Sequence, residues 1–105
     1  MAKILVTGGL GFIGSNLVPE LKKRGHKLWV CDLGHSEGPN YTRCDVSKYR
    51  QLERLFEEHD FDYVYHLAAE YGRWNGEDYY ENLWLTNGVG TKNIIRLQEK
   101  KRFST

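Results

Sequence analysis

The 105-residue sequence has little of what marks several common classes of protein. It contains two cysteines and two prolines, and its formal net charge is only +1, with both signs spread along the chain. No apolar run approaches the ~20 residues of a membrane-spanning helix. Cys31 and Cys44 are isolated and have neither metal-ligand spacing nor a redox-pair motif. These scarcities argue against a membrane protein, a disulfide framework, a metal centre and a nucleic-acid-binding surface.

The N-terminal residues and the cysteines indicate a compartment. The chain enters an apolar run at once, without the basic region and cleavage site that are typical of a signal peptide. Two isolated thiols fit a reducing environment, so we expect a cytoplasmic protein in which Cys31 and Cys44 are small buried side chains.

What the sequence does contain is an alternation of short apolar runs and amphipathic stretches, in a chain long enough for one domain. The apolar runs predict strands at Lys3–Thr7, Lys27–Leu33, Tyr41–Val46 and Phe61–Ala68, and the start of a fifth at Phe103–Thr105. The amphipathic stretches predict helices over Phe12–Arg24, from Ser47 as N-cap to Glu58, and over Asp78–Lys100. This alternation predicts an α/β fold, a parallel sheet with helices on both faces, truncated before or within its fifth strand.

The stretch "VTGGLGFIGSN" places three glycines three residues apart, where the first strand gives way to the first helix. A turn that holds a pyrophosphate must be tight, must let the phosphates approach the backbone, and must pack the helix against the strand. Glycine satisfies all three demands, and the helix N-terminus supplies N–H groups and partial positive charge. The expected cofactor-binding loop comprises Gly8, Gly11, Phe12, Ile13 and Gly14.

A phosphate-binding loop of the ATPase kind is a rival interpretation, because Gly9 and Gly14 have its glycine spacing. That motif requires a lysine and then a serine or threonine after the last glycine. Here Ser15 and Asn16 occupy those positions, so the rival is rejected.

An acidic residue, Asp32, lies at the end of the second predicted strand. A carboxylate there accepts hydrogen bonds from the ribose hydroxyls of a dinucleotide and repels a 2′-phosphate, which favours NAD over NADP. The loop that follows, "LGHSEGPN", has no arginine or lysine, and only a protonated His35 would weaken the preference. Together with the glycines, Asp32 predicts a Rossmann-type, doubly wound dinucleotide-binding fold.

Four motifs in order, "TGGLGFIG", "CDV", "HLAA" and "NGVGTKNII", resemble the extended short-chain dehydrogenase/reductases. The nearest branch is the NAD-dependent epimerase/dehydratase family that acts on nucleotide sugars, of the UDP-glucose 4-epimerase type. The resemblance covers nearly the whole chain and implies that residues 1–105 are the N-terminal part of an NAD(P)-binding Rossmann domain. It also implies a homodimer for the intact protein, since the helix at Asp78–Lys100 matches one that builds the family's dimer interface.

The resemblance implies roles for particular residues. Asp45 and Val46 match the pair that lines the adenine site, and Leu67, Ala68 and Ala69 match the strand end that passes the pyrophosphate and nicotinamide ribose. Asn87 matches a helix asparagine near the active site. It also interrupts an apolar helical face, and the glycines at 88 and 90 suggest that something approaches this helix closely. Candidate contacts to the substrate or the cofactor in the loop after the fourth strand are Tyr71, Arg73 and Trp74.

No catalytic residue is assigned. The family takes a hydroxyl proton with a tyrosine that is followed four positions later by a lysine, and none of the seven tyrosines here has that lysine. We therefore expect the chain, inactive alone, to be the cofactor-binding part of an NAD-dependent nucleotide-sugar epimerase or dehydratase. The alternatives are an NADP-dependent carbonyl reductase of the same extended family and a non-catalytic dinucleotide-binding sensor or subunit. The fourth strand is expected to have an unpaired outer edge, which would make the isolated fold marginal.

Overall fold

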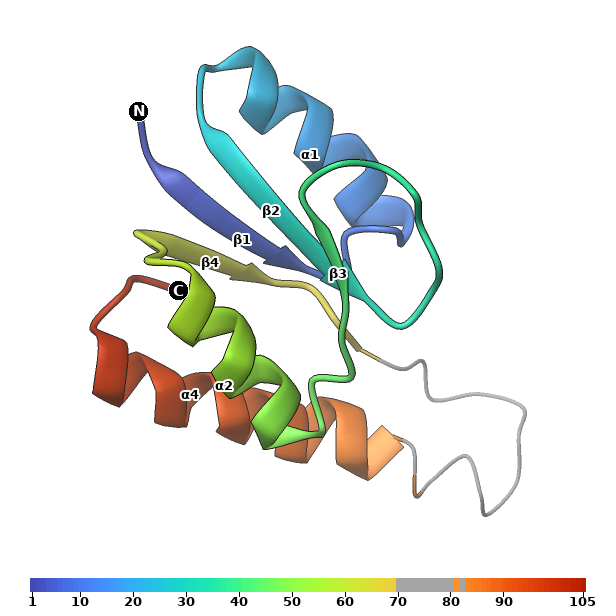
Figure 1. Ribbon diagram of the computed structural model, residues 1–105. Coiled ribbons are helices and arrows are strands. Elements are labelled where there is room, and N and C mark those ends of the chain that lie inside the picture. Colours follow the sequence, from blue (N-terminus) through green and yellow to red (C-terminus); the bar gives the residue numbers. More distant parts are fainter. Residues whose placement is uncertain (70–80, 82) are drawn as a thin grey trace.

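The computed structural model of the chain describes residues 1–69, 81 and 83–105, and its centre is a parallel sheet of four strands (Figure 1). The sheet order is β3-β2-β1-β4. The second and third strands are therefore added on one side of β1, and the fourth strand pairs with β1 on the opposite side. Ile4 of β1 lies opposite Leu28 of β2 and Tyr63 of β4. The strands are β1 (Lys3–Thr7), β2 (Lys27–Asp32), β3 (Tyr41–Arg43) and β4 (Tyr63–His66). The predicted parallel α/β fold is confirmed, although β2, β3 and β4 are shorter than expected.

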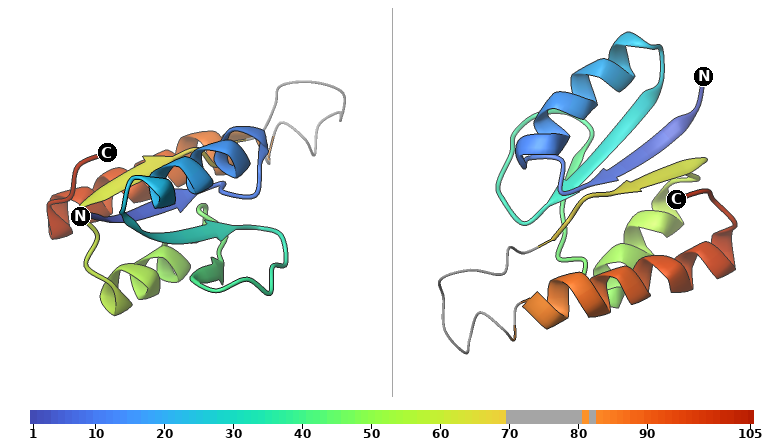
Figure 2. Two further views of the ribbon diagram at one scale, coloured as in Figure 1. Left: turned by 90° about the horizontal axis from the view of Figure 1, so that it is seen from above. Right: turned by 180° about the vertical axis from the view of Figure 1, so that it is seen from behind.

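Helices lie on both sides of the sheet, as Figure 1 and the right-hand view of Figure 2 show. One side carries α1 (Phe12–Lys23), and the other carries α2 (Tyr49–Glu58) together with α4 (Gly90–Lys101). A π-helical segment, η1 (Trp84–Val89), leads directly into α4. The last predicted helix is present, but Trp84–Val89 has π-helical geometry between the α-helical residues 81 and 83 and α4. Its expected start at Asp78 lies outside the described residues.

The core has two layers, one on each face of the sheet, because successive strand residues point to opposite faces. Leu5, Cys31 and Val64 belong to the layer beneath α2 and α4. Ile4 and Leu28 belong to the layer beneath α1. Burial on both faces explains why the central strand β1 is apolar from Ile4 to Val6.

Two local expectations are wrong. Ser47 does not cap α2, since Lys48 is the N-cap residue and the Ser47 hydroxyl donates instead to Asp45. The outer edge of β4 is not wholly unpaired, since the Val64 amide donates to the Ser104 carbonyl at 2.8 Å. Ser104 thus forms a parallel bridge where a fifth strand was expected to begin. Within the described part of the chain, no helix is both long and apolar enough to cross a membrane.

Candidate functional site

The glycine loop between β1 and α1 is shaped by close backbone contacts. Gly8 has a φ of +69°, in the left-handed region that favours glycine, and its amide donates to the Cys31 carbonyl at 2.8 Å. A Cβ atom on the buried Gly14 would lie 2.6 Å from the Gly8 carbonyl oxygen, closer than atoms can approach. Gly14 therefore allows α1 to start directly against the loop, as the spacing predicted.

The middle glycine has a different environment. Gly11 is exposed, and a Cβ atom there would meet only the Gly8 carbonyl oxygen, at 3.3 Å. It is the N-cap residue of α1, and the first turn of that helix contains no acidic side chain. The first amides of a helix have no partner within it and carry partial positive charge. The bare backbone at Gly11 thus leaves the N-terminus of α1 open to an anionic group.

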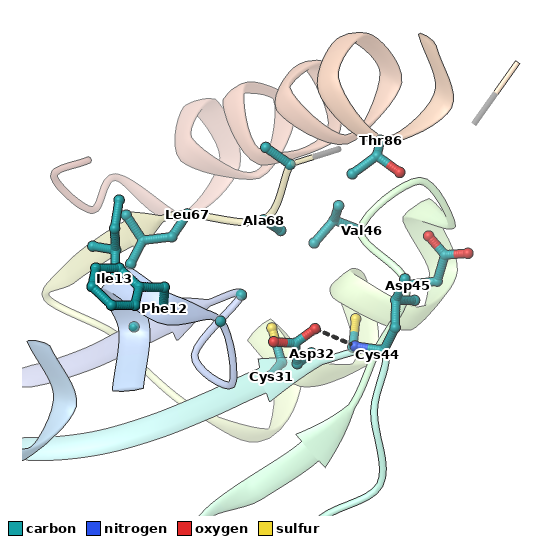
Figure 3. A pocket seen from close by; sticks show the side chains of 15 residues that line it. Phe12, Ile13, Cys31, Asp32, Cys44, Asp45, Val46, Leu67, Ala68 and Thr86 are labelled. Carbon is teal, nitrogen blue, oxygen red and sulfur yellow. Dashed lines mark hydrogen bonds between the residues drawn. The ribbon is translucent and has the colours of Figure 1, made fainter. Parts of the chain in front are cut away.

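A cavity of about 240 Å³ opens between this loop and the carboxyl ends of the strands (Figure 3). It brings together eleven of the twelve residues that were predicted to bind the cofactor. These are Gly8, Gly11, Phe12, Ile13, Gly14, Asp32, Asp45, Val46, Leu67, Ala68 and Ala69. Ligands of open α/β sheets bind at this edge, where the strand order reverses.

Asn87 is the predicted residue that the cavity does not include. It lies exposed in η1, and the neighbouring Thr86 lines the cavity instead. No sequence motif pointed to Thr86, which lies in the π-helical segment η1. The three candidate substrate contacts, Tyr71, Arg73 and Trp74, lie outside the described residues.

Asp32 is fixed between the glycine loop and the loop that follows β2. Its Oδ2 accepts a hydrogen bond from the Leu10 amide at 2.9 Å, and its Oδ1 accepts one from the Leu33 amide at 2.7 Å. A carboxylate has about four acceptor positions, so each oxygen retains capacity for a hydroxyl donor. Asp32 is therefore held at the cavity with acceptor capacity to spare.

A cation that the sequence analysis missed lies beside Asp32. Arg43 is the register partner of Asp32 on the adjacent strand β3, and its Nε donates to the Leu33 carbonyl at 2.8 Å. The loop directly after Asp32 has no arginine or lysine, and Arg43 lies beyond it in the chain. Strand pairing brings Arg43 next to Asp32 in the sheet from eleven positions further along the chain, although Arg43 is not among the residues that line the cavity.

The Asp45–Val46 segment is held at both ends of its backbone. The Asp45 amide donates to Gln51 Oε1 at 2.8 Å, and its carboxylate accepts from both the amide and the hydroxyl of Ser47. The Val46 carbonyl accepts from the buried side-chain amide of Asn93 at 2.9 Å. This segment is thereby fixed as one wall of the cavity.

The glycines of the last helix are explained by protein neighbours. A Cβ atom on Gly90 would lie 2.7 Å from Val46 Cγ2, so Gly90 lets α4 approach the cavity wall. A Cβ atom on Gly88 would lie 2.8 Å from the Trp84 ring. The close approach that the two glycines suggested is therefore made by Val46 and Trp84 side chains.

The remaining predictions concern cysteines and metal. Cys31 and Cys44 are both buried and both line the cavity. Hydrogen bonding to Cys44, together with burial, raises the pKa of the Cys31 thiol well above its usual value. Among the residues that the structure describes, no group of three or more His, Cys, Asp or Glu side chains is placed to hold a metal ion.

The chain is similar to several characterised proteins. It is 33% identical to a UDP-N-acetyl-alpha-D-glucosaminuronate decarboxylase from Bacillus cytotoxicus, over 95% of this chain and 34% of that protein. A Thermus thermophilus UDP-glucose 4-epimerase, solved in complex with NAD, superposes with a TM-score of 0.85 at 28% identity, over 95% of this chain and 34% of that one. The Bordetella bronchiseptica enzyme WbmH, solved with NAD+, gives a TM-score of 0.81 at 29% identity, over 97% and 36%.

The chain thus spans about a third of the length of these relatives. The family profile described as "NAD dependent epimerase/dehydratase family" matches residues 4–104. This match covers all four strands apart from Lys3, the first residue of β1, and every described residue that lines the cavity. The chain belongs to the NAD-dependent epimerase/dehydratase family.

Proposed function

We propose that this chain is the NAD-binding part of an enzyme that epimerises or dehydrates nucleotide sugars. The observation that carries the proposal is the cavity at the carboxyl ends of the strands. There the open N-terminus of α1 faces the same space as the Asp32 carboxylate. An anionic diphosphate fits against the glycine loop, and ribose hydroxyls fit the acceptor positions of Asp32.

Each wall of the cavity has a proposed part in holding the dinucleotide. Asp45 and Val46 would contact the adenine, and Leu67, Ala68 and Ala69 would let the pyrophosphate and nicotinamide ribose lie close to the backbone. The bound nicotinamide would accept a hydride from the sugar and return it. The chain contributes binding and orientation to that chemistry, and we assign no proton-transfer residue within it.

Calorimetric titration of NAD into the 105-residue chain tests the proposal, with Gly11→Val as the decisive variant. The valine Cβ atom meets only the Gly8 carbonyl oxygen, at 3.3 Å, so the backbone has to shift by only a few tenths of an ångström, while the methyl groups occupy the approach to the α1 N-terminus. We expect at least a tenfold loss of affinity. Gly38→Val, in the exposed loop after β2, is the matched control and retains wild-type affinity. Equal affinities for wild type and Gly11→Val would refute the proposal.

A specific observation keeps the NADP-dependent alternative in view. Arg43 is paired in register with Asp32, and its guanidinium, which donates to the Leu33 carbonyl, is capable of pairing with a 2′-phosphate. We propose that the Asp32 carboxylate dominates, so that NAD binds more tightly than NADP. Asp32→Asn should then improve NADP affinity and weaken NAD affinity, and Arg43→Ala should reverse the NADP gain in the double variant. Tighter binding of NADP than NAD by the wild type would favour the reductase.

Three further expectations complete the proposal. The intact protein would take a nucleotide sugar as its small-molecule substrate and form a homodimer through the helix that contains α4. Its location would be cytoplasmic, in agreement with the free thiols of Cys31 and Cys44. Sedimentation of the intact protein tests the dimer, and a monomer at micromolar concentration would contradict it.

A further inference from the structure

His66, at the end of β4, lies in a hydrogen-bond network that joins three elements. Its Nδ1 is 2.7 Å from the hydroxyl oxygen of Thr7 in β1, and its Nε2 is 3.3 Å from the hydroxyl oxygen of Thr91 in α4. Thr7 is completely buried, and His66 is partly buried. His66 is the first residue of the "HLAA" motif, but it is not among the residues that line the cavity, and the proposed function assigns it no role.

The Thr7 hydroxyl also receives two backbone amides from the strand end that lines the cavity. The Leu67 amide donates to Thr7 Oγ1 at 3.0 Å, while also lying 3.1 Å from the Thr7 carbonyl oxygen. The Ala68 amide donates to Thr7 Oγ1 at 3.2 Å. A Cβ atom on Gly8 would lie 2.7 Å from the Ala68 nitrogen, so the two backbones are in direct contact here.

These contacts determine the protonation state of the imidazole. A threonine hydroxyl has one proton and two lone pairs. The two amides donate to Thr7 Oγ1, so the arrangement that satisfies every group directs the Thr7 proton to an unprotonated His66 Nδ1. In the neutral ring the proton then resides on Nε2, which donates to Thr91 Oγ1.

We propose that His66 is a positioning residue for the cofactor cavity. In its neutral Nε2–H form it orients the Thr7 hydroxyl, which in turn fixes the backbone of Leu67 and Ala68 along the cavity wall. Protonation would place a third donor against the Thr7 oxygen, and the hydroxyl would have to release an amide. The expected effect of His66 on NAD affinity rests on the proposed function, whereas the expected tautomer of His66 and the protection of the Leu67 and Ala68 amides do not.

The surroundings favour the neutral ring at physiological pH. The side chains hydrogen-bonded to it from β1 and α4 are both uncharged hydroxyls. Burial lowers the pKa of His66 below its usual value of about 6.5. The positioning contact is therefore complete above that value and is lost as the pH falls through the lower pKa of the folded chain.

NMR of the 15N-labelled, 105-residue chain tests the tautomer without any ligand. We expect a protonated Nε2 and an unprotonated Nδ1 for His66 at neutral pH. We also expect the amides of Leu67 and Ala68 to be protected from hydrogen exchange, with protection factors that fall as His66 becomes protonated. A protonated Nδ1, or protection factors that are indifferent to this titration, would overturn the inference even if NAD binds.

Two substitutions extend the test to the cofactor. His66→Asn keeps an acceptor oxygen near the position of Nδ1 but does not titrate, and His66→Phe keeps a ring without an acceptor. We expect the NAD affinity of the wild type to fall on acidification. The affinity of His66→Asn should stay within about threefold of the wild-type value at neutral pH and should depend less on pH. The affinity of His66→Phe should be about tenfold below the wild-type value, which corresponds to the loss of one hydrogen bond.

The outcomes separate the two proposals. If the wild type binds no NAD, the proposed function fails, and the tautomer and the exchange data still decide the role of His66. If His66→Asn binds as poorly as His66→Phe and keeps the wild-type pH profile, the positioning role is wrong. If His66→Phe does not fold, the comparison of wild type with His66→Asn decides.

Discussion

The side-chain amide of Asn93 donates a hydrogen bond of 2.9 Å to the carbonyl oxygen of Val46, 47 residues earlier in the chain. Asn93 is only 3% exposed, so both partners are shielded from water. The bond joins α4 to the segment between β3 and α2 that forms one wall of the cavity. The buried asparagine that connects the last helix to the cavity wall is thus Asn93, not the predicted Asn87.

Replacing Asn93 by leucine should destabilise the chain. The substitution leaves the Val46 carbonyl without its donor in a buried place, which costs about 1–3 kcal/mol. Urea denaturation measures the loss. Lys92→Ala, at the exposed neighbouring position, is the control and should change stability by less than ~0.5 kcal/mol. Similar midpoints for both variants would show that the bond contributes little.

Gly8→Ala should be more destabilising than Gly25→Ala, although both glycines have positive φ values, +69° and +88°. Each alanine suffers the left-handed backbone strain of ~1–2 kcal/mol. Only the alanine at 8 meets backbone, 2.7 Å from the Ala68 nitrogen, whereas nothing lies within 4 Å of a Cβ atom at 25. We expect an additional loss of about 1–3 kcal/mol at Gly8. Thermal unfolding of the two variants measures the difference, and equal losses would contradict the contact.

Gly90→Ala and Gly88→Ala should differ in the sign of their effect. Alanine improves helix propensity by ~1 kcal/mol at either position. At 90 the new methyl group lies 2.7 Å from a side-chain carbon of the buried Val46, and overpacking of about 1–3 kcal/mol outweighs the gain. At 88 it meets the ring of Trp84, which is 66% exposed and able to move outward. We therefore expect Gly88→Ala to be neutral or stabilising in chemical denaturation; a loss as large as that of Gly90→Ala would count against this account.

His59 should make the stability of the chain depend on pH. Its Nδ1 is 2.9 Å from Lys3 Nζ, and its ring lies 4.1 Å from the Trp29 ring. Burial, and then the Lys3 charge, lower the pKa of His59 below its usual value. Because the unfolded chain binds this proton more readily, stability is highest above about pH 6.5 and declines as the pH falls through the folded-state pKa.

Urea midpoints at about pH 7.5 and about pH 5.5 measure this dependence, since the two values bracket the unfolded pKa of histidine. His59→Gln should reduce the decline without abolishing it, because His66 also has a lowered pKa. His35→Gln, whose side chain is 77% exposed, is the control and should keep the wild-type profile. An unchanged decline in His59→Gln would show that its protonation is not linked to folding.

The sequence by itself determined the order of strands and helices, the parallel sheet and the glycine loop. These are properties of local patterns. Continuous apolar runs report burial on both faces of a strand, and the spacing of Gly8, Gly11 and Gly14 reports the space a turn requires within a few residues. The position of Asp32 also followed, because the carboxyl ends of neighbouring parallel strands meet at one edge.

Only the tertiary structure decided which side chains from distant segments meet at that edge. Arg43 reaches Asp32 through strand pairing, Asn93 reaches Val46 through helix packing, and Thr7 receives amides from the end of β4. Thr86, in the π-helical segment η1, lines the cavity where Asn87 was expected. The spacing of apolar residues along the sequence does not predict such pairs, because each depends on how elements that are far apart in the chain align in three dimensions.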